Sequence, residues 1–218
     1  MQKKIKILFL AANPRATSQL RLDEEIREIK AKIHQSNERS FIEIESSWAV
    51  RPDDVIQQLN ALKPDIVHFS GHGDSSGNIV LNDENGNPKH ISPKAIKHLF
   101  TTIKKNIKLV FLNLCNSQIQ ADALIDVIDT VIGMKKPITD GAAITFAASF
   151  YRALGYGESI KMAYQQGITA ILLDGSDEDE TPVLFHNASI DPNCIFLLND
   201  SDDSAEDVTA KKKATTAS

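Results

Sequence analysis

Hydrophobic runs alternate with amphipathic segments along most of the chain. Residues 5–12 are almost continuously apolar and end at Asn13-Pro14, which is typical of a buried parallel strand and its exit turn. The next segment carries apolar side chains at helical spacing, at Leu22, Ile26, Ile29 and Ile33. This pattern predicts a strand followed by a helix.

The same two patterns recur to the end of the apolar part of the sequence. Further strands are expected at 41–50, 66–69, 109–114, 130–134 and 182–186. Further helices are expected at 52–62, 93–103, 117–128, 140–154 and 159–172, with Ser117 and Asp140 as N-caps. The dipeptide Asn85-Gly86 predicts a small β-hairpin inserted between residues 78 and 91. Alternation of Ile and Glu over residues 42–45 is typical of a strand at or near the sheet edge.

Strands that alternate with helices predict a mostly parallel sheet with helices on both faces. The 218 residues suffice for one such α/β domain, which we expect over residues 1–198. Residues 199–218 have almost no apolar anchor and are expected to be a disordered tail. In a sheet of this kind, ligands bind outside the carboxyl ends of the strands.

Composition excludes several classes of partner. The net charge is −5, basic residues are scattered and aromatic residues make up 6% of the chain, so we expect no direct nucleic-acid contact and no membrane surface. The two cysteines, Cys115 and Cys194, form neither a disulfide framework nor a CxxC metal motif, which indicates a reducing, cytoplasmic setting. No apolar run reaches membrane-spanning length. No nucleotide-binding glycine motif follows a strand, and Asp83-Glu84-Asn85-Gly86 lacks the ligand spacing of a calcium loop, so we expect neither a cofactor nor a metal.

Two reactive side chains stand where neighbouring strands are expected to end. His72 follows the strand at 66–69 and Cys115 follows the strand at 109–114. Strands joined by a helical crossover are usually neighbours, about 4.8 Å apart, so both side chains should lie on one rim of the sheet. A thiol nucleophile and its proton-transfer partner need this arrangement.

The residues around this pair suit catalysis. Gly71 and Gly73 flank His72 and leave room for a substrate, and Cys115 comes directly before an expected helix, whose N-terminus favours a thiolate. Each residue alone also has an ordinary structural interpretation, Cys115 as inert core and His72 as a solvated turn residue. We interpret His68 as a satisfied buried histidine and Cys194 as core. The residues by themselves leave these alternatives open.

The run Val67-His68-Phe69-Ser70-Gly71-His72-Gly73, followed by Val110-Phe111-Leu112-Asn113-Leu114-Cys115-Asn116-Ser117, resembles the CHAT domain family, prokaryotic relatives of caspases and separase. The likeness also includes Leu20-Arg21-Leu22-Asp23-Glu24-Glu25-Ile26 and Phe150-Tyr151-Arg152-Ala153-Leu154. It implies a caspase-hemoglobinase fold, a three-layer sandwich with strand order 2-1-3-4-5-6.

The resemblance also implies roles for individual residues. His72 and Cys115 would be catalytic, and the backbone N–H groups of Gly73 and Cys115 would form the oxyanion hole. By position, Asn13, Asn113 and Asp140 would contribute to the S1 pocket, which holds the P1 side chain before the cleaved bond. Asp140 would bind a basic P1 side chain, although an N-cap for the helix at 140–154 is the more common role of such a residue.

Three functions compete. The leading hypothesis is a cysteine endopeptidase acting on protein substrates under the control of a regulatory protein or sensor module, in a prokaryotic defence or cell-death pathway. The second is a catalytically silent interaction module of the same fold. The third, a small-molecule hydrolase that uses the same dyad, has no sequence feature of its own.

Overall fold

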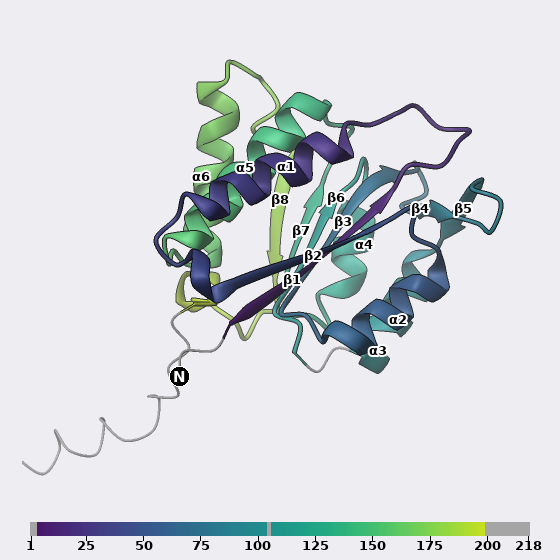
Figure 1. Cartoon of the computed structure of the whole chain (residues 1–218), viewed down its shortest axis with the longest axis horizontal. Coiled ribbons are helices and arrows are strands. Elements are labelled where there is room, and N and C mark those ends of the chain that lie inside the picture. Colours follow the sequence, from purple (N-terminus) through teal and green to yellow (C-terminus); the bar gives the residue numbers. More distant parts are fainter. Residues whose placement is uncertain (1–3, 104–105, 199–218) are drawn as a thin grey trace, which may run out of the picture.

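A central β-sheet organises the molecule (Figure 1). The structure is a computed structural model that describes residues 4–103 and 106–198. The main strands follow the order β2-β1-β3-β6-β7-β8, and only β8 runs antiparallel to its neighbour. Their bounds are β1 Ile5–Ala12, β2 Ile42–Trp48, β3 Ile66–Gly73, β6 Leu109–Asn113, β7 Thr130–Met134 and β8 Pro182–His186. With the hairpin left out, this is the expected order 2-1-3-4-5-6, which is confirmed.

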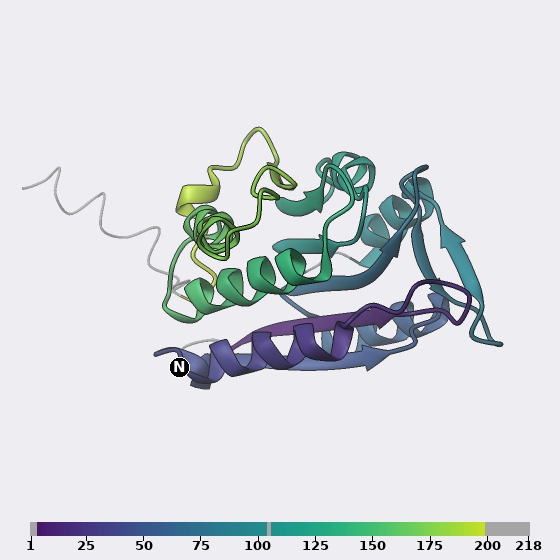
Figure 2. The same ribbon diagram turned by 90° about the horizontal axis from the view of Figure 1, so that it is seen from above.

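Helices cover both faces of the sheet and complete three layers (Figure 2). One face carries α1 Leu22–His34, α5 Asp140–Gly155 and α6 Ile160–Leu173. The opposite face carries α2 Pro52–Leu62, α3 Pro93–Ile103 and α4 Gln118–Leu124. Helices α1 and α5 lie side by side over the sheet in both ribbon views.

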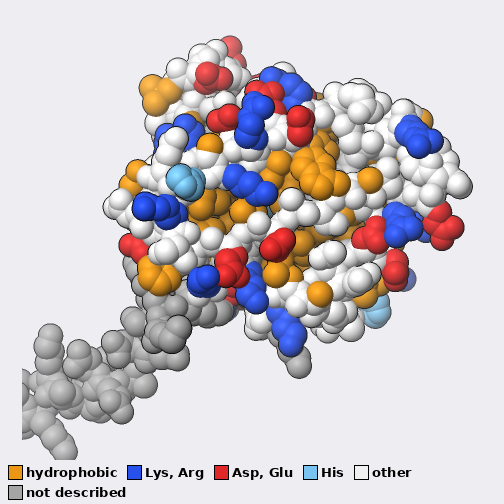
Figure 3. All heavy atoms as spheres, viewed as in Figure 1, with side chains coloured by type: hydrophobic (Ala, Val, Ile, Leu, Met, Phe, Trp, Pro, Cys, Tyr) orange, Lys and Arg blue, Asp and Glu red, His pale blue; other side chains and the backbone are white. Residues whose placement is uncertain are grey.

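The alternation of side chains along each strand builds two separate cores. In β1, Ile7 and Phe9 pack under α1 and α5, whereas Leu8 and Leu10 pack against α2. The edge strand β2 is only partly buried, as its Ile/Glu alternation predicts. Its last residue, Trp48, is 48% exposed, and hydrophobic side chains are visible in the centre of the face that β2 crosses (Figure 3).

The expected hairpin forms from β4 Ile79–Asn82 and β5 Pro88–Ile91. The Asp83 carboxylate accepts the backbone N–H groups of Asn85 and Asn87 and so fixes the turn. Strand β4 also pairs antiparallel with the end of β3, His72 opposite Val80. Strand β3 therefore continues four residues past the expected end at Phe69, because Ser70 and Gly71 still pair with β1 and His72 and Gly73 pair with β4.

Three local expectations are wrong. Ser117 does not cap α4; its hydroxyl is buried, donates to Leu112 O at 3.0 Å and accepts Met134 N–H at 2.9 Å, which ties β6 to β7. The N-cap of α5 is Thr139, whose side chain accepts Ala142 N–H, so Asp140 is already the first helical residue. Cys194 is exposed, because it ends a 3₁₀ turn and the burial of this segment falls on Leu197 and Leu198. The expected disordered tail, residues 199–218, lies outside the described residues.

We predict that Gly167→Ala destabilises the protein although alanine is the better helix former. A Cβ at this position of α6 would lie 2.6 Å from the buried ring of Phe146 and 3.1 Å from its carbonyl oxygen. Alanine gains about 1 kcal/mol of helix propensity, but overpacking costs about 1–3 kcal/mol. Thermal unfolding should show a Tm about 2–4 °C lower. The exposed neighbour variant Gln165→Ala should leave Tm nearly unchanged; a raised Tm for Gly167→Ala would contradict the packing described.

Candidate active site

The register of β3 and β6 brings His72 and Cys115 to the same level of the sheet. The two strands pair in parallel, with His68 opposite Phe111 and Ser70 opposite Asn113. Extending this register by two residues places His72 opposite Cys115. Neighbouring strands lie about 4.8 Å apart, so the expected juxtaposition of imidazole and thiol follows from the observed pairing.

Both side chains also share the face of the sheet that α1 and α5 cover. Along a strand, every second side chain points the same way. On this face His68 stacks on Phe111 with 4.4 Å between ring centroids. One pair further along, Ser70 and Asn113 both bond the carboxylate of Glu25 on α1. His72 and Cys115 are the next pair in the series, at the rim where the ladder ends.

Beneath this pair, the side chain of His68 is completely buried, as expected. Its Nδ1 lies 3.1 Å from the hydroxyl of Tyr151, whose pKa is raised by burial and by the charge of Glu25, so Tyr151 stays protonated and can donate. His68 Nε2 lies 2.9 Å from Glu25 Oε1 but makes no hydrogen bond of regular geometry there. The expectation of a fully satisfied His68 is therefore met at one ring nitrogen only.

A backbone carbonyl orients the His72 ring. Nε2 lies 2.9 Å from Ser18 O, and because a carbonyl can only accept, Nε2 carries the hydrogen. In the neutral ring, Nδ1 is then the nitrogen available to take a proton. Burial lowers the pKa of His72, while the bond to Ser18 and the charge of Asp140 oppose that shift. The resting imidazole is therefore neutral at pH 7, as a proton acceptor must be.

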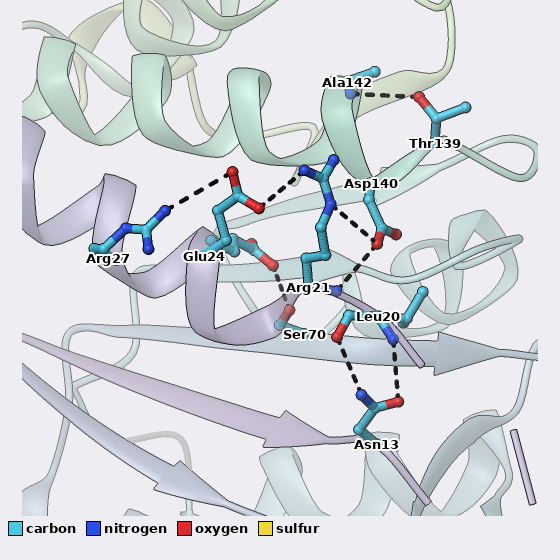
Figure 4. Close-up of polar contacts among 10 residues, drawn as sticks. Asn13, Leu20, Arg21, Glu24, Arg27, Ser70, Thr139, Asp140 and Ala142 are labelled. Carbon is cyan, nitrogen blue, oxygen red and sulfur yellow. Dashed lines mark hydrogen bonds and ion pairs between the residues drawn. The ribbon is translucent and has the colours of Figure 1, made fainter. Parts of the chain in front are cut away.

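Ser18 belongs to a loop, residues 13–21, that is fixed by contacts to the hairpin and within itself. Arg15 N–H donates to Gly86 O of the hairpin turn at 3.0 Å. The Asn13 amide donates to Leu20 O at 3.2 Å and closes the loop internally (Figure 4). Asn13 was expected to contribute to the S1 pocket, but its side chain is used in this closure.

Gly73 is required by the close approach of two backbones. A Cβ there would lie 2.1 Å from Cys115 O, so any side chain would push β3 and β6 apart. Asp74 N–H bonds Asn78 O, and antiparallel pairs alternate between bonded and non-bonded, so the Gly73–Ile79 pair is a non-bonded one. The Gly73 N–H consequently points away from β4, toward the side on which Cys115 lies. Its role in an oxyanion hole, together with Cys115 N–H, stays a prediction.

Cys115 itself is a half-buried free thiol. The chain turns sharply after it, with Asn116 at φ 56°, and α4 begins at Gln118. This helix has only seven residues and starts three positions after the thiol, so its dipole is a weaker influence than the sequence suggested.

A narrow cavity of about 30 Å³ opens beside Cys115. Of the expected S1 residues, Asn113 and Asp140 line it and Asn13 does not. Sequence reasoning missed its other polar lining residues, Arg21, Glu25 and Ser70. One signal was present for Glu25: it lies among the apolar positions of α1 at helical spacing, where an unexplained carboxylate indicates a buried polar role.

Asp140 lines this cavity with a side chain that is 30% exposed, which places it toward the mouth, and it pairs with Arg21 (Figure 4). Its Oδ2 accepts the backbone N–H of Arg21 at 3.0 Å and lies 3.7 Å from the guanidinium Nε. The carboxylate is thus positioned by α5 and by the end of the 13–21 loop. It is placed to bind a cation, and one already lies there.

Residues 4–103 and 106–198 contain neither a cluster of metal ligands nor a membrane-spanning helix. No group of three or more His, Cys, Asp or Glu side chains there is arranged to hold a metal ion. None of the described helices has both the length and the apolar character needed to cross a bilayer.

Comparison with known proteins settles the family, because the CHAT domain model matches residues 2–192. The chain belongs to the CHAT domain family. It is 28% identical over 178 residues to a "Probable protease" of Gillisia limnaea and 26% identical over 173 residues to a "Roc-COR-CHAT protease" of an unknown prokaryotic organism. The matches cover 80% and 76% of this chain but only 32% and 16% of those relatives.

Solved structures confirm the expected caspase-like fold. A secreted C11 cysteine protease from Bacteroides thetaiotaomicron matches with a TM-score of 0.60 at 12% identity, over 84% of this CHAT domain and 66% of that chain. The Arg-specific cysteine proteinase gingipain R matches with a TM-score of 0.62 at 13% identity, over 90% and 50%. Caspase-1 from Spodoptera frugiperda matches with a TM-score of 0.55 at 11% identity, over 85% and 86%.

We predict that Asp140→Asn lowers the pKa of His72 further. Burial already lowers this pKa, and the negative charge of Asp140 is one of the two influences that oppose burial. Without that charge the imidazolium is less stabilised, so protonation requires a lower pH. An NMR titration of the His72 ring protons in both proteins measures the midpoint. An unchanged or higher midpoint would show that Asp140 does not act on the imidazole.

We also predict that iodoacetamide modifies Cys115 of the CHAT domain before Cys194, although Cys194 is exposed. The charge of Asp191 raises the pKa of the Cys194 thiol, which lowers its thiolate fraction at neutral pH. Asp191→Asn should therefore speed the labelling of Cys194 and leave that of Cys115 unchanged, as peptide mass spectrometry after brief exposure would show. Faster labelling of Cys194 in the wild-type protein would contradict this order.

Proposed function

We propose that this CHAT domain is a cysteine endopeptidase that cleaves protein substrates with Cys115 and His72. The observation that carries the proposal is the register of β3 and β6, which puts a thiol and a neutral, carbonyl-oriented imidazole on one face at one rim of the sheet. The two relatives are themselves named as proteases. A cysteine that merely filled the core would need neither the neighbouring imidazole nor the cavity beside it.

The geometry supports a separate chemical role for His72 and for Cys115. His72 Nδ1 takes the proton of the Cys115 thiol, and the thiolate attacks the carbonyl carbon of the peptide bond. The oxyanion that forms is held by the backbone N–H groups of Gly73 and Cys115. The His72 imidazolium then protonates the leaving amine, and water hydrolyses the remaining thioester on Cys115.

The proposal includes control by another module. The chain spans a third or less of the length of the curated relatives it matches, and the name of one relative, Roc-COR-CHAT, names further parts beside the CHAT domain. We infer that a partner protein or sensor module restrains or activates the site. The family resemblance extends this to a defence or cell-death pathway, and the two unpaired cysteines suit a reducing cytoplasm.

We predict that Cys115→Ala and His72→Ala each abolish peptide-bond cleavage and leave the fold intact. Neither side chain belongs to the two hydrophobic cores, so Tm should change little. The two groups act in one sequence of steps, so the double variant should be little worse than either single variant. The measurement is kcat/KM on a peptide library, with thermal unfolding alongside.

Two matched variants control this experiment. Cys194→Ala removes the other thiol, and His98→Ala removes an exposed histidine of α3, on the sheet face opposite to α1 and α5; both should retain wild-type kcat/KM. Cleavage by Cys115→Ala at the wild-type rate would rule out this dyad. A wild-type protein that binds a partner through this rim but cleaves no peptide would favour the silent interaction module.

A further inference from the structure

The inner end of the cavity beside Cys115 is built from hydrogen-bond acceptors. The Glu25 carboxylate is 3% exposed and lines the cavity. Within the described residues, the hydrogen bonds to it come from the neutral side chains of Ser70 and of Asn113, whose Nδ2 lies 2.6 Å from Oε1, and His68 Nε2 lies 2.9 Å from the same oxygen. A buried carboxylate is costly unless a cation or strong donors compensate it. Neither Ser70 nor Asn113 carries a charge that would balance the carboxylate, and His68 makes no hydrogen bond of regular geometry to it.

A second hydrogen-bond acceptor in the same cavity, the side-chain oxygen of Asn113, has no donor within the described residues. Asn113 is 6% exposed, and its Oδ1 makes no hydrogen bond to any part of the chain that the structure describes. Its amide nitrogen already donates to Glu25, so Oδ1 needs a separate hydrogen-bond donor. Unpaired buried acceptors are uncommon because desolvating them is unfavourable. A ligand that enters the cavity with N–H donors would satisfy Asn113 and Glu25 together.

The mouth and the walls of the cavity further restrict which ligand fits it. At the mouth, Asp140 already holds the guanidinium of Arg21, a side chain that is 52% exposed and can move into solvent. The walls include the apolar side chains of Leu22 and Ile144. The cavity thus combines carboxylates, a free carbonyl and apolar walls, which together fit a cation on an aliphatic stem.

We propose that this cavity is the S1 pocket and selects an arginine at P1, with Glu25 at its base as the specificity-determining residue. This inference rests on the proposed function and adds a residue to the expected Asn113 and Asp140. Arginine has five N–H donors and no acceptor, so one planar group can serve Glu25 and Asn113 at once. Acidic P1 side chains are repelled by Glu25. At about 30 Å³ the cavity must widen to admit the guanidinium, which displacement of Arg21 from Asp140 permits.

The test measures how fast peptidyl chloromethyl ketones alkylate Cys115, which requires no turnover. Probes that carry arginine or citrulline at P1 differ in charge but hardly in shape. In the wild-type protein the arginine probe should react at least ~10-fold faster than the citrulline probe, as expected when a charge-assisted contact is lost. Glu25→Gln should reduce this ratio ~10-fold or more. Asp23→Asn, which changes an exposed carboxylate on α1 that does not line the cavity, should preserve it.

Iodoacetamide, which has no P1 group, separates this inference from the proposed function. If iodoacetamide does not modify Cys115, the nucleophile assignment fails and the S1 inference with it. If iodoacetamide modifies Cys115 but the wild-type protein reacts equally with both peptidyl probes, the S1 inference alone is overturned. A Glu25→Gln protein that slows both probes equally would show a purely structural role and also overturn it. Thermal unfolding verifies that this variant folds; if it does not, the wild-type ratio decides.

Discussion

The parallel pairing of β3 with β6 is the constraint on which the site depends. Three pairs of side chains follow one another along these strands. His68 stacks on Phe111, Ser70 and Asn113 bond the same carboxylate, and the last pair is the imidazole and the thiol. Beyond the last paired residues the two backbones remain so close that only glycine fits at position 73. A shift of one residue would turn one partner to the opposite face, and the dyad would not form.

The rim is also tied to the helical layer by a polar network that starts at Glu25. Glu25 on α1 bonds side chains at the ends of β3 and β6, and Tyr151 on α5 bonds His68 beneath them. Such buried networks stiffen a structure when every member is satisfied and are costly where one is not. Two atoms of this network make no hydrogen bond, Asn113 Oδ1 and His68 Nε2, and both belong to side chains beside Glu25. We propose that the substrate supplies the missing donor on the side of the network that faces the cavity.

Periodicity sufficed to predict the strands, the helices and the rim that holds His72 and Cys115, because these depend on patterns repeated within short segments. It failed where contacts between distant segments decide. Nothing near Ser18 indicates that its carbonyl will orient His72, since that contact depends on the path of a loop across the sheet. Asp140 was expected to be the N-cap of α5, but Thr139 has that role. The Asp140 carboxylate instead bonds Arg21, 119 positions away in sequence. Cys194 begins an apolar run but lies in a turn outside the core.

A covalent intermediate on Cys115 would be direct evidence that this thiol is the nucleophile. Wild-type protein mixed with an activated peptide ester that ends in arginine, then quenched in acid within milliseconds to seconds, can be digested and mapped by mass spectrometry. We expect the acyl group of the ester as a thioester on the peptide that contains Cys115, and we expect it to disappear when the reaction is allowed to finish. Hydrolysis of the ester with no adduct on Cys115 at any time, or with the acyl group on another residue, would contradict it.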